Sequence, residues 1–307
     1  MHNCSHHYDL QNVNPFHMEG DVWVHTMMVC KQSTTHHRNA QIAALLHDIG
    51  KPATREINPK NNHVRFLNHD AVSAFMALEV LKNPYLHLET EDIVEIFNLI
   101  ALHTQVYKQD ENQLRETLRG QPDLANRLVQ LGRADDAGRF SNLSKDILPL
   151  YDIPEKHENL SKKSVTLLCG LPGSGKSSSI KGDSFIVSRD HLITRDYPDL
   201  TYNEAWKQVD QKQIDRQLQE LYLASKSSND VVVDMTHMSK KSRRKSLSHY
   251  GKDWEKNCVV FLPTLKEIEV RNENREGKTI GKHVIDKMMR SFYPPTYEEF
   301  NNIRYVL

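Results

Sequence analysis

Apolar positions in the first half of the chain follow a helical period. Apolar residues spaced three and four positions apart predict helices at about 19–33, 39–48, 67–82, 90–106 and 123–140. This half contains no convincing strand pattern. We therefore predict that residues 1–150 form an all-α helical bundle.

The pattern changes after Tyr151. The segment DIPEKHENLSKK is polar, contains a proline and lacks clear periodicity, which indicates a linker at residues 151–163. Beyond it, helical stretches at about 176–182, 203–227, 239–250 and 264–275 separate the short apolar runs SVTLLCG, FIVS, DVVVDM and CVVFL. This alternation predicts an α/β domain with a parallel sheet over residues 164–307.

The composition agrees with two folded domains. The 307 residues are 38% hydrophobic and 26% charged, which argues against wholesale disorder. No apolar run approaches the roughly 20 residues that span a bilayer, and the N-terminus lacks the regions of a signal peptide. We therefore expect a cytoplasmic protein with no membrane partner. The cysteines form neither a CxxC pair nor a disulfide framework, which agrees with a reducing compartment: Cys4, Cys30, Cys169 and Cys258.

The net charge is zero, but the charges are unevenly distributed. Residues 1–160 contain 15 basic and 21 acidic residues, whereas residues 161–307 contain 25 basic and 19 acidic residues. Metal-binding carboxylates would contribute to the acidic half, and a polyanionic partner would suit the basic half. Ordinary surface variation explains the same imbalance, so the asymmetry supports other observations without deciding between functions.

The motif GLPGSGKS predicts a nucleotide-phosphate site because it follows an apolar strand and precedes a predicted helix. Its glycines allow backbone N–H groups to turn toward a β-phosphate, and a helix N-terminus adds positive potential. Lys176 would reach the β- and γ-phosphates, and Ser177 would bind Mg²⁺. The loop residues predicted to contact ATP or another nucleoside triphosphate are Gly170, Gly173, Ser174, Gly175, Lys176, Ser177 and Ser178.

Two aspartates stand where predicted strands end. Asp190 follows the run FIVS, and Asp234 closes the run DVVVD. The carboxyl ends of parallel strands face the ligand crevice of such a sheet. Asp190 could therefore accept a proton from an incoming hydroxyl, and Asp234 could anchor Lys176, Ser177 or the metal. Simple helix capping is the alternative role for both.

Residues 264–291 predict a lid over the nucleotide. An arginine on a closing segment can neutralise the charge that develops on a reacting triphosphate. We assign this role to Arg275, with Arg271 as a second nucleotide contact. A solvent-exposed helix face is the alternative. The lid candidates are Arg271, Asn272, Arg275 and Lys278, followed by a helix through Met288 and Arg290.

The second half resembles the kinase domain of polynucleotide 5′-kinases. The resemblance covers about 164–307, and it implies Asp190 as general base and Arg275 as a phosphate ligand. The family's arginine three positions after the base is replaced here by Ile193, and the nearest downstream arginine is Arg195. The matching segments are GLPGSGKS, Ser188–Asp190, Asp234 with the basic helix after it, and Arg271–Lys278. The basic run Lys240–Lys245 either holds the nucleic-acid strand or forms an exposed helix face.

The first half contains a set of imidazoles and carboxylates within helical patterns. Imidazole and carboxylate ligands together suit Mn, Fe, Co, Ni or Zn, and such ions activate water and polarise phosphoryl oxygens. Lys51 and Arg139 would neutralise phosphate charge. Each histidine alone would more often be structural, so the prediction depends on the whole set. The set is His25, the pair His47-Asp48, His69-Asp70, His103 and Asp135.

The order of these residues resembles the HD phosphohydrolase superfamily over about residues 15–140. The phrase HMEGDVWVHT is similar to the HD domain of bacterial CCA-adding tRNA nucleotidyltransferases, which removes 2′,3′-phosphates. The resemblance implies one or two transition-metal ions. It implies His25, His47, Asp48 and Asp135 as core ligands, with His69 and His103 completing a second metal or phosphate site. Asp135 is preferred over Asp136 because it lies four positions before Arg139.

An HD domain followed by a polynucleotide kinase domain resembles the HD-Pnk end-healing enzymes. The resemblance implies ATP-dependent phosphorylation of an RNA or DNA 5′-OH and removal of 2′,3′-cyclic, 2′- or 3′-phosphate. It is compatible with coupling to a polynucleotide ligase. One alternative is an HD nucleotidase fused to a small-molecule kinase, which Ile193 favours. Another is a degraded HD domain that only regulates the kinase or binds nucleic acid.

Overall fold

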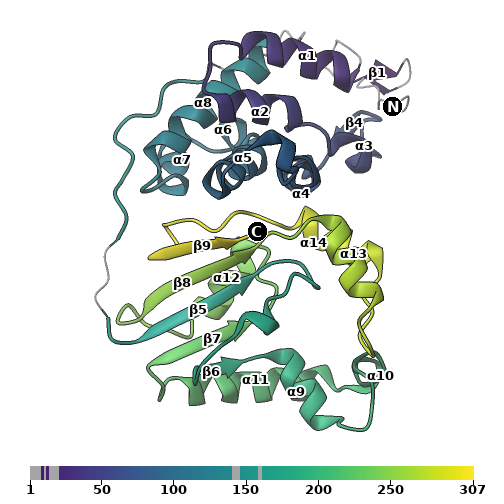
Figure 1. The fold of residues 1–307 in the computed structure, drawn as a ribbon, viewed down its shortest axis with the longest axis vertical. Helices are drawn as coiled ribbons and strands as arrows, with labels where there is room; N and C mark the ends of the chain where they lie inside the picture. Colours follow the sequence, from purple (N-terminus) through teal and green to yellow (C-terminus); the bar gives the residue numbers. More distant parts are fainter. Residues whose placement is uncertain (1–7, 10–11, 14–20, 140–145, 158–160) are drawn as a thin grey trace. The chain divides into compact units, whose positions relative to one another are not determined.

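The computed structural model describes residues 8–9, 12–13, 21–139, 146–157 and 161–307, which form two compact units (Figure 1). The first unit contains Met1–Glu155 and Met289–Pro294, and the second contains Lys156–Met288 and Pro295–Leu307. Cys4, the ends of two predicted helices at 19–20 and 140, and residues 158–160 of the predicted linker lie outside the described residues. Among the described residues, no helix is long and apolar enough to cross a membrane.

The first unit is helical, as the apolar period predicts. Its α-helices are α1 (Val22–Gln32), α2 (Arg38–Leu46), α3 (Lys51–Thr54), α4 (His69–Leu81), α5 (Thr90–Leu102), α6 (Gln105–Lys108), α7 (Glu111–Thr117) and α8 (Pro122–Ala137). The 3-10 helix η1 (Pro84–Leu86) and the antiparallel pairs β1 (Tyr8–Asp9) with β2 (Asn12–Val13) and β3 (Arg55–Ile57) with β4 (Val64–Phe66) complete it. The sequence did not predict these strands, because two or three residues are too few to show an alternating pattern.

Helix α5 is central to the packing of the helical unit, where it contacts α2, α4 and α8. Phe75 of α4 and Phe97 of α5 meet edge to face, with ring centroids 5.4 Å apart. Phe292, from the segment Met289–Pro294, packs against both rings at 5.1 and 5.6 Å. All three phenylalanines are buried. The core of this unit therefore contains a segment from near the other end of the sequence, which the predicted boundaries of 1–150 and 164–307 did not include.

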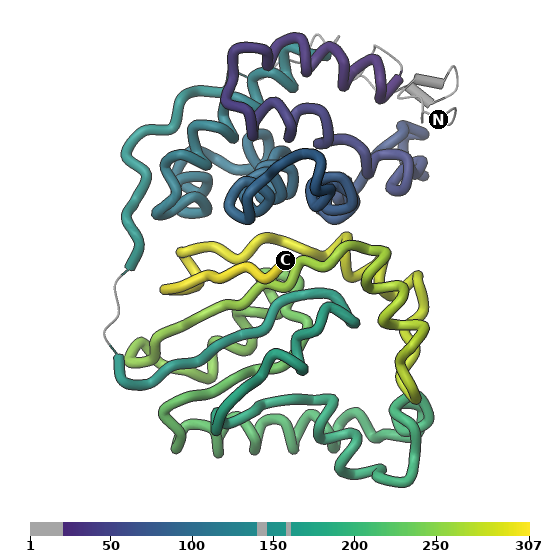
Figure 2. Tube along the Cα trace, viewed as in Figure 1, coloured from purple at the N-terminus to yellow at the C-terminus, as the bar shows by residue number. Residues whose placement is uncertain are grey.

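The second unit is built on a five-stranded parallel sheet in the order β6-β7-β5-β8-β9, with β9 at one edge (Figure 2). The strands are β5 (Ser164–Cys169), β6 (Phe185–Val187), β7 (Asp230–Asp234), β8 (Glu255–Phe261) and β9 (Asn302–Val306). The helices are η2 (Ser177–Ser179, 3-10), α9 (Arg189–Asp196), α10 (Tyr202–Gln208), α11 (Gln211–Ser225), α12 (Lys240–Leu247), α13 (Leu265–Glu273) and α14 (Lys282–Arg290). Strand β5 is central and fully apolar from Leu167 to Cys169, as expected for a strand covered on both faces.

Three predicted features of this unit need correction. The helix predicted at 176–182 is only the 3-10 turn η2. The helix predicted at 203–227 is two helices, because Asp210 caps the N-terminus of α11 through a hydrogen bond from Lys212 N. Helix α9 and strand β9 were not predicted. Both are short, and the positions of β9 are either exposed or only partly buried.

The basic run on α12 is only partly available to a nucleic acid. Arg243 is fully buried, and its guanidinium donates to Glu299 Oε1 and Oε2 at 3.1 and 2.8 Å. It also donates to the His237 carbonyl at 3.2 Å. Lys240 is paired with Glu298. Arg243 and Lys240 were expected either on an exposed helix face or in contact with a nucleic-acid strand. Both instead bind α12 to residues 298–299.

The buried ion pair gives a stability prediction. Arg243→Met leaves the Glu299 carboxylate buried without its cation, so the free energy of unfolding of the second unit should fall by about 3–5 kcal/mol. Urea titration followed by tryptophan fluorescence measures the loss. The double variant Arg243→Met/Glu299→Gln should recover much of it, and Arg244→Met, at an exposed neighbouring position, should change it little. Equal stability of Arg243→Met and the unaltered protein would contradict this account.

Candidate active sites in the two units

Local structure brings the predicted histidines and acids of the helical unit to one place. His47 and His103 directly follow the last residues of α2 and α5, and His69 is the first residue of α4. His25 lies in α1, and Asp135 lies in the last turn of α8. Of the six predicted ligands, only His69 is partly exposed. The other five are buried: His25, His47, Asp48, His103 and Asp135.

A backbone carbonyl fixes each imidazole. Since a carbonyl can only accept, each Nδ1 must carry a proton, so Nε2 is the ring nitrogen that can bind a metal ion. Gly138 makes the contact to His25 possible, because a Cβ at that position would lie 2.8 Å from Val29 N. The Nδ1 atoms of His25, His47, His69 and His103 lie 3.2, 2.7, 2.8 and 2.7 Å from the carbonyl oxygens of Gly138, Ala44, Phe66 and Ile100.

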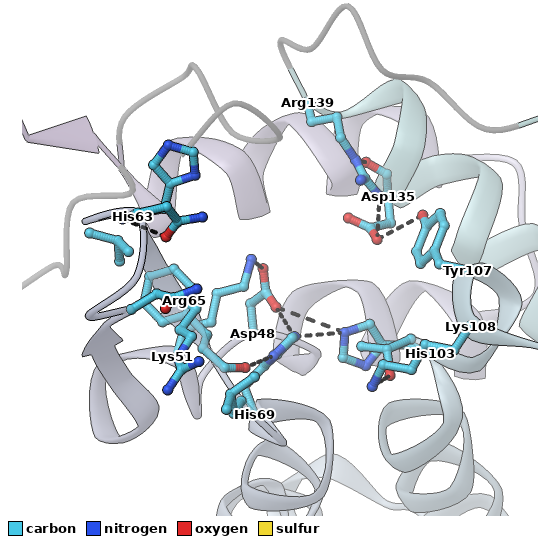
Figure 3. Close-up of a pocket in the computed structure, with 16 residues that line it drawn as sticks. Asp48, Lys51, His63, Arg65, His69, His103, Tyr107, Lys108, Asp135 and Arg139 are labelled. Carbon is cyan, nitrogen blue, oxygen red and sulfur yellow. Dashed lines mark hydrogen bonds and ion pairs between the residues drawn. The ribbon is translucent and has the colours of Figure 1, made fainter. Parts of the chain in front are cut away.

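The Asp48 carboxylate lies between two groups of imidazoles. Its Oδ2 is 3.5 Å from His25 Nε2 and 3.2 Å from His47 Nε2. Its Oδ1 is 3.3 Å from His69 Nε2 and 3.9 Å from His103 Nε2 (Figure 3). One carboxylate therefore faces both groups, as a ligand shared by two cations would.

Asp135 completes the group that contains His25 and His47. Its Oδ1 is 3.0 Å from His25 Nε2 and 3.8 Å from His47 Nε2. Its Oδ2 accepts hydrogen bonds from Tyr107 Oη at 2.8 Å and from Arg139 Nη2 at 3.0 Å. The Arg139 guanidinium also lies over the Tyr107 ring, 4.7 Å from its centroid. Sequence reasoning missed Tyr107, because no spacing marks a tyrosine that orients a ligand from another helix.

The electrostatics of this cluster fit a cation. Among the described residues, His47 Nε2 and both Asp48 carboxylate oxygens are buried without a hydrogen-bond partner. Lys51 Nζ, 2.6 Å from Asp48 Oδ2, forms an ion pair rather than a well-aligned hydrogen bond. Burial opposes the charged imidazole of His47, yet Asp48 and Asp135 raise its pKa to about 10. Burial and the neighbouring His69 and His47 lower the pKa of His103 to about 3.

These side chains form two ligand groups, His25-His47-Asp135 and Asp48-His69-His103, in each of which the ligand atoms lie within 4.8 Å of one another. Imidazole with carboxylate is a ligand set suited to first-row transition metals or zinc. The residues present therefore fit one or two divalent ions. Metal identity depends on coordination geometry and not on the donor types alone.

A cavity of about 520 Å³ opens onto the second ligand group. Four cationic side chains line it: Lys51, Arg65, Lys108 and Arg139. Lys108 Nζ donates to Thr104 Oγ1 at 2.8 Å, and Thr104 in turn is hydrogen-bonded to the buried carboxylate of Asp70. The cavity therefore combines ligand atoms at its base with positive charge on its walls, as a phosphate-bearing substrate requires.

In the second unit, the loop GLPGSGKS leaves the end of β5 and leads into η2. Gly173 and Gly175 adopt φ values of 80° and 91°, which turn backbone N–H groups toward a common point. Lys176 Nζ lies inside the loop and donates to the carbonyl oxygens of Gly170 and Leu171 at 2.9 and 2.8 Å. Its burial lowers the pKa of Lys176 to about 8. Ser174 is buried against it, whereas Ser177 and Ser178 are exposed.

Two carboxylates lie at the end of β7 and shortly after the end of the neighbouring strand β6. Asp234, the last residue of β7, accepts a hydrogen bond from Ser177 Oγ at 2.6 Å. This pairing is the one that a Mg²⁺ site in such a loop uses. Asp190, in the first turn of α9, accepts a hydrogen bond from Tyr202 Oη at 2.6 Å and is paired with Lys278. The N-cap of α9 is Ser188, so Asp190 is not the capping residue.

Of the predicted lid residues Arg271, Asn272 and Arg275, only Arg271 contacts the phosphate loop directly in the hydrogen bonds of the described residues. Arg271, near the end of α13, donates to the Gly173 carbonyl at 3.4 Å, so it reaches the phosphate loop. Arg275 is exposed. Burial opposes the charged form of Asp190, but Lys278 and Tyr202, with a smaller contribution from Arg275, lower the pKa of Asp190. Asn272 exchanges two hydrogen bonds with the Ile280 backbone and closes the loop after α13. Ile193 is buried, and Arg195 is paired with Asp196.

Comparison with known proteins assigns the two units to known domain types. Residues 21–135 match the HD domain, and residues 165–295 match an AAA domain. The chain therefore has a helical HD domain followed by an α/β domain of the P-loop kinase type. These are the domains of an enzyme that modifies nucleotides or nucleic acids. HD domains bind divalent metals, and a P-loop kinase uses ATP with magnesium.

Two curated relatives are tRNA nucleotidyltransferases. The chain is 31% identical over 145 residues to the CC-adding tRNA nucleotidyltransferase of Thermus thermophilus, which covers 43% of this chain and 32% of that protein. It is 29% identical over 172 residues to the A-adding tRNA nucleotidyltransferase of Deinococcus radiodurans, which covers 50% of this chain and 39% of that protein. The matches thus span 32% and 39% of the lengths of these relatives.

The shared carboxylate gives a prediction for metal binding. Asp48→Asn removes the charge that faces both ligand groups, so the protein should lose the divalent transition metals that copurify with it or that it takes up on titration. Inductively coupled plasma mass spectrometry gives the metal content. Asp123→Asn, an exposed position of the same unit, is the control and should retain full content. An undiminished metal content of the Asp48→Asn protein would contradict a metal site at Asp48.

The Tyr107 hydroxyl gives a second, weaker prediction. Tyr107→Phe removes a hydrogen bond to Asp135 Oδ2 and leaves the ligand itself in place. Loss of such a supporting partner typically costs about 10–100-fold in metal affinity. Competition with a chromophoric chelator measures this affinity. Tyr151→Phe, at an exposed tyrosine of the helical unit, should bind metal as the unaltered protein does, and equal affinities of all three proteins would refute the role.

Proposed function

We propose that the protein heals broken nucleic-acid ends with two separate active sites. The P-loop domain transfers the γ-phosphate of ATP to a polynucleotide 5′-OH, and the HD domain removes a 2′,3′-cyclic, 2′- or 3′-phosphate. The observation that carries the proposal is the convergence of four Nε2 atoms and two carboxylates next to a basic cavity, in a chain that also has a complete phosphate loop. The two products are the 5′-phosphate and the 3′-OH that a ligase joins.

In the HD domain, divalent ions when bound supply an activated water and a charge that polarises the phosphoryl group. His25, His47, Asp48 and Asp135 hold the core site, and His69 and His103 complete a second ion or phosphate position. Lys51 and Arg139 neutralise charge on the phosphate that enters the cavity, because both lie on its wall within ion-pair distance of a ligand carboxylate. The resemblance of this region to HD phosphohydrolases supports these roles.

In the kinase domain, Asp190 accepts the proton of the 5′-OH while the γ-phosphate is transferred in line. The Gly170–Ser178 loop binds the triphosphate, with Lys176 on its β- and γ-oxygens. Ser177 and Asp234 hold the magnesium ion that accompanies ATP. Arg271 and Arg275 add positive charge from the side of α13. The support is the position of Asp190 and Asp234 at the carboxyl ends of β6 and β7, the edge of the sheet at which such folds bind ligands.

Two independent sites predict separable activities. Lys176→Ala should abolish 5′-phosphorylation and leave phosphate removal unchanged, whereas Asp48→Ala should do the reverse. The assay uses one RNA with a 5′-OH and a 2′,3′-cyclic phosphate, a parallel 3′-phosphate RNA, the matching DNA, ATP and a panel of divalent metals. Labelled product and released phosphate are measured separately.

Control variants and alternative substrates make this test decisive. Lys181→Ala and Asp123→Asn remove the same charges at exposed positions and should retain both activities. Loss of both activities in a well-folded Lys176→Ala or Asp48→Ala protein would refute separate sites. Transfer to free nucleosides but not to oligonucleotides would replace the proposal with a nucleotidase fused to a small-molecule kinase. A metal-free, inert HD domain would leave only a regulatory or binding role for it.

A further inference from the structure

A tyrosine on α10 contacts the proposed general base. Tyr202 Oη donates a hydrogen bond to Asp190 Oδ1 at 2.6 Å. Burial and the negative charge of Asp190 raise the pKa of Tyr202, so the phenol keeps its proton. Tyr202 therefore fixes one oxygen of the carboxylate, and its ring lies beside the place where the attacking hydroxyl must arrive.

A lysine from the loop after α13 contacts the other oxygen. Lys278 Nζ is paired with Asp190 Oδ2 and lies 3.7 Å from the centroid of the Tyr202 ring. Lys278 is largely buried, although most residues of its loop are exposed. The arginines of α9 are engaged elsewhere, since Arg189 is paired with Asp215 and Arg195 with Asp196. Ile193, between them, is buried and apolar.

Backbone contacts hold this loop against α10, next to which it lies in Figure 1. Asn203 N donates to the Gly277 carbonyl at 3.1 Å, and Asn203 Nδ2 donates to the Thr279 carbonyl at 3.3 Å. Gly277 has a φ of 68°, and a Cβ there would lie 3.3 Å from the Thr201 side chain. The carbonyls on both sides of Lys278 are thus bound by one residue of α10, through its backbone N–H and its side-chain amide. The Lys278–Tyr202 arrangement is built into the fold and is not a chance contact of two long side chains.

One turn further along α10, Trp206 extends this aromatic surface. Its ring stacks on Tyr202, with centroids 6.0 Å apart and an interplanar angle of 24°. Trp206 remains 46% exposed, although a tryptophan gains most by burial. Trp206, Tyr202 and Asp190 are therefore in contact one after another, from an exposed indole ring to the proposed catalytic carboxylate. Lys278 lies beside the Tyr202 ring.

We propose that Lys278, Tyr202 and Trp206 form the acceptor subsite of the kinase domain. The base of the 5′-terminal nucleotide stacks on Trp206, and Lys278 binds the phosphate that follows the attacked hydroxyl. The inference rests on the proposed kinase function and specifies its substrate as an unpaired nucleic-acid end. An indole accepts any base because every base has an aromatic face, so the subsite selects for an unpaired base and not for sequence.

The test compares acceptors that differ only in one base. A 5′-OH oligonucleotide and its counterpart with an abasic 5′-terminal nucleotide present the same hydroxyl and phosphates. The unaltered protein should favour the complete oligonucleotide in kcat/KM by roughly 5- to 100-fold, the range expected for one stacked base. Trp206→Ala should reduce this preference to near unity, by losing activity on the complete acceptor alone. Trp206→Phe should retain much of the preference.

A control and a second variant distinguish the outcomes. Tyr85→Ala removes a highly exposed aromatic side chain of the helical unit and should keep the full preference for the complete acceptor. Lys278→Met should raise KM for both acceptors more than it lowers the preference between them, since the phosphate is common to both. An equal loss on both acceptors in Trp206→Ala, or no preference in the unaltered protein, would overturn the subsite while leaving the kinase proposal intact. Absence of transfer to either acceptor by the unaltered protein would overturn both.

Discussion

The helical unit depends on one buried carboxylate. Asp48 faces two imidazoles with each oxygen, and neither oxygen has a hydrogen-bond partner among the described residues. A buried charge without such partners is costly unless cations surround it. Lys51 offsets part of this cost, and a divalent ion in either ligand group would offset more. Divalent ions held by these side chains would therefore also stabilise the helices that bring them together, through the same contacts.

In the second unit, the strand order of the sheet determines which parts of the site lie next to one another. Parallel strands place their carboxyl ends at one edge, so β5, β6 and β7 supply the phosphate loop, Asp190 and Asp234 at neighbouring positions. What the sheet leaves open is the side from which the acceptor arrives. The loop after α13 and the exposed face of α10 border Asp190 on that side, and the contacts of Asn203 keep them together. Under the proposed function, specificity for the acceptor would reside in this loop and helix surface, and the phosphoryl transfer would take place at the ends of the strands.

Neither unit is continuous in sequence. The phenylalanine cluster of the helical unit is completed by Phe292, which follows α14, and the chain then returns to the sheet to form β9. Arg290 Nη2 donates to the Ala53 carbonyl at 2.6 Å within the same helical unit. The helical core is therefore completed by a segment that is synthesised after most of the second unit.

The amino-acid sequence by itself determined the fold class, the helices with strong apolar period, the principal strands and the residue types of both sites. These follow from local period and from motifs whose members are close together in the chain, such as GLPGSGKS and His47-Asp48. The tertiary structure alone decided that Asp48 faces both imidazole groups, that Tyr107 orients Asp135, and that Arg243 is buried. It also decided that Lys278 and Tyr202 hold Asp190. The physical reason is that these contacts join residues far apart in the chain, and no local pattern records how packed helices and loops align their side chains.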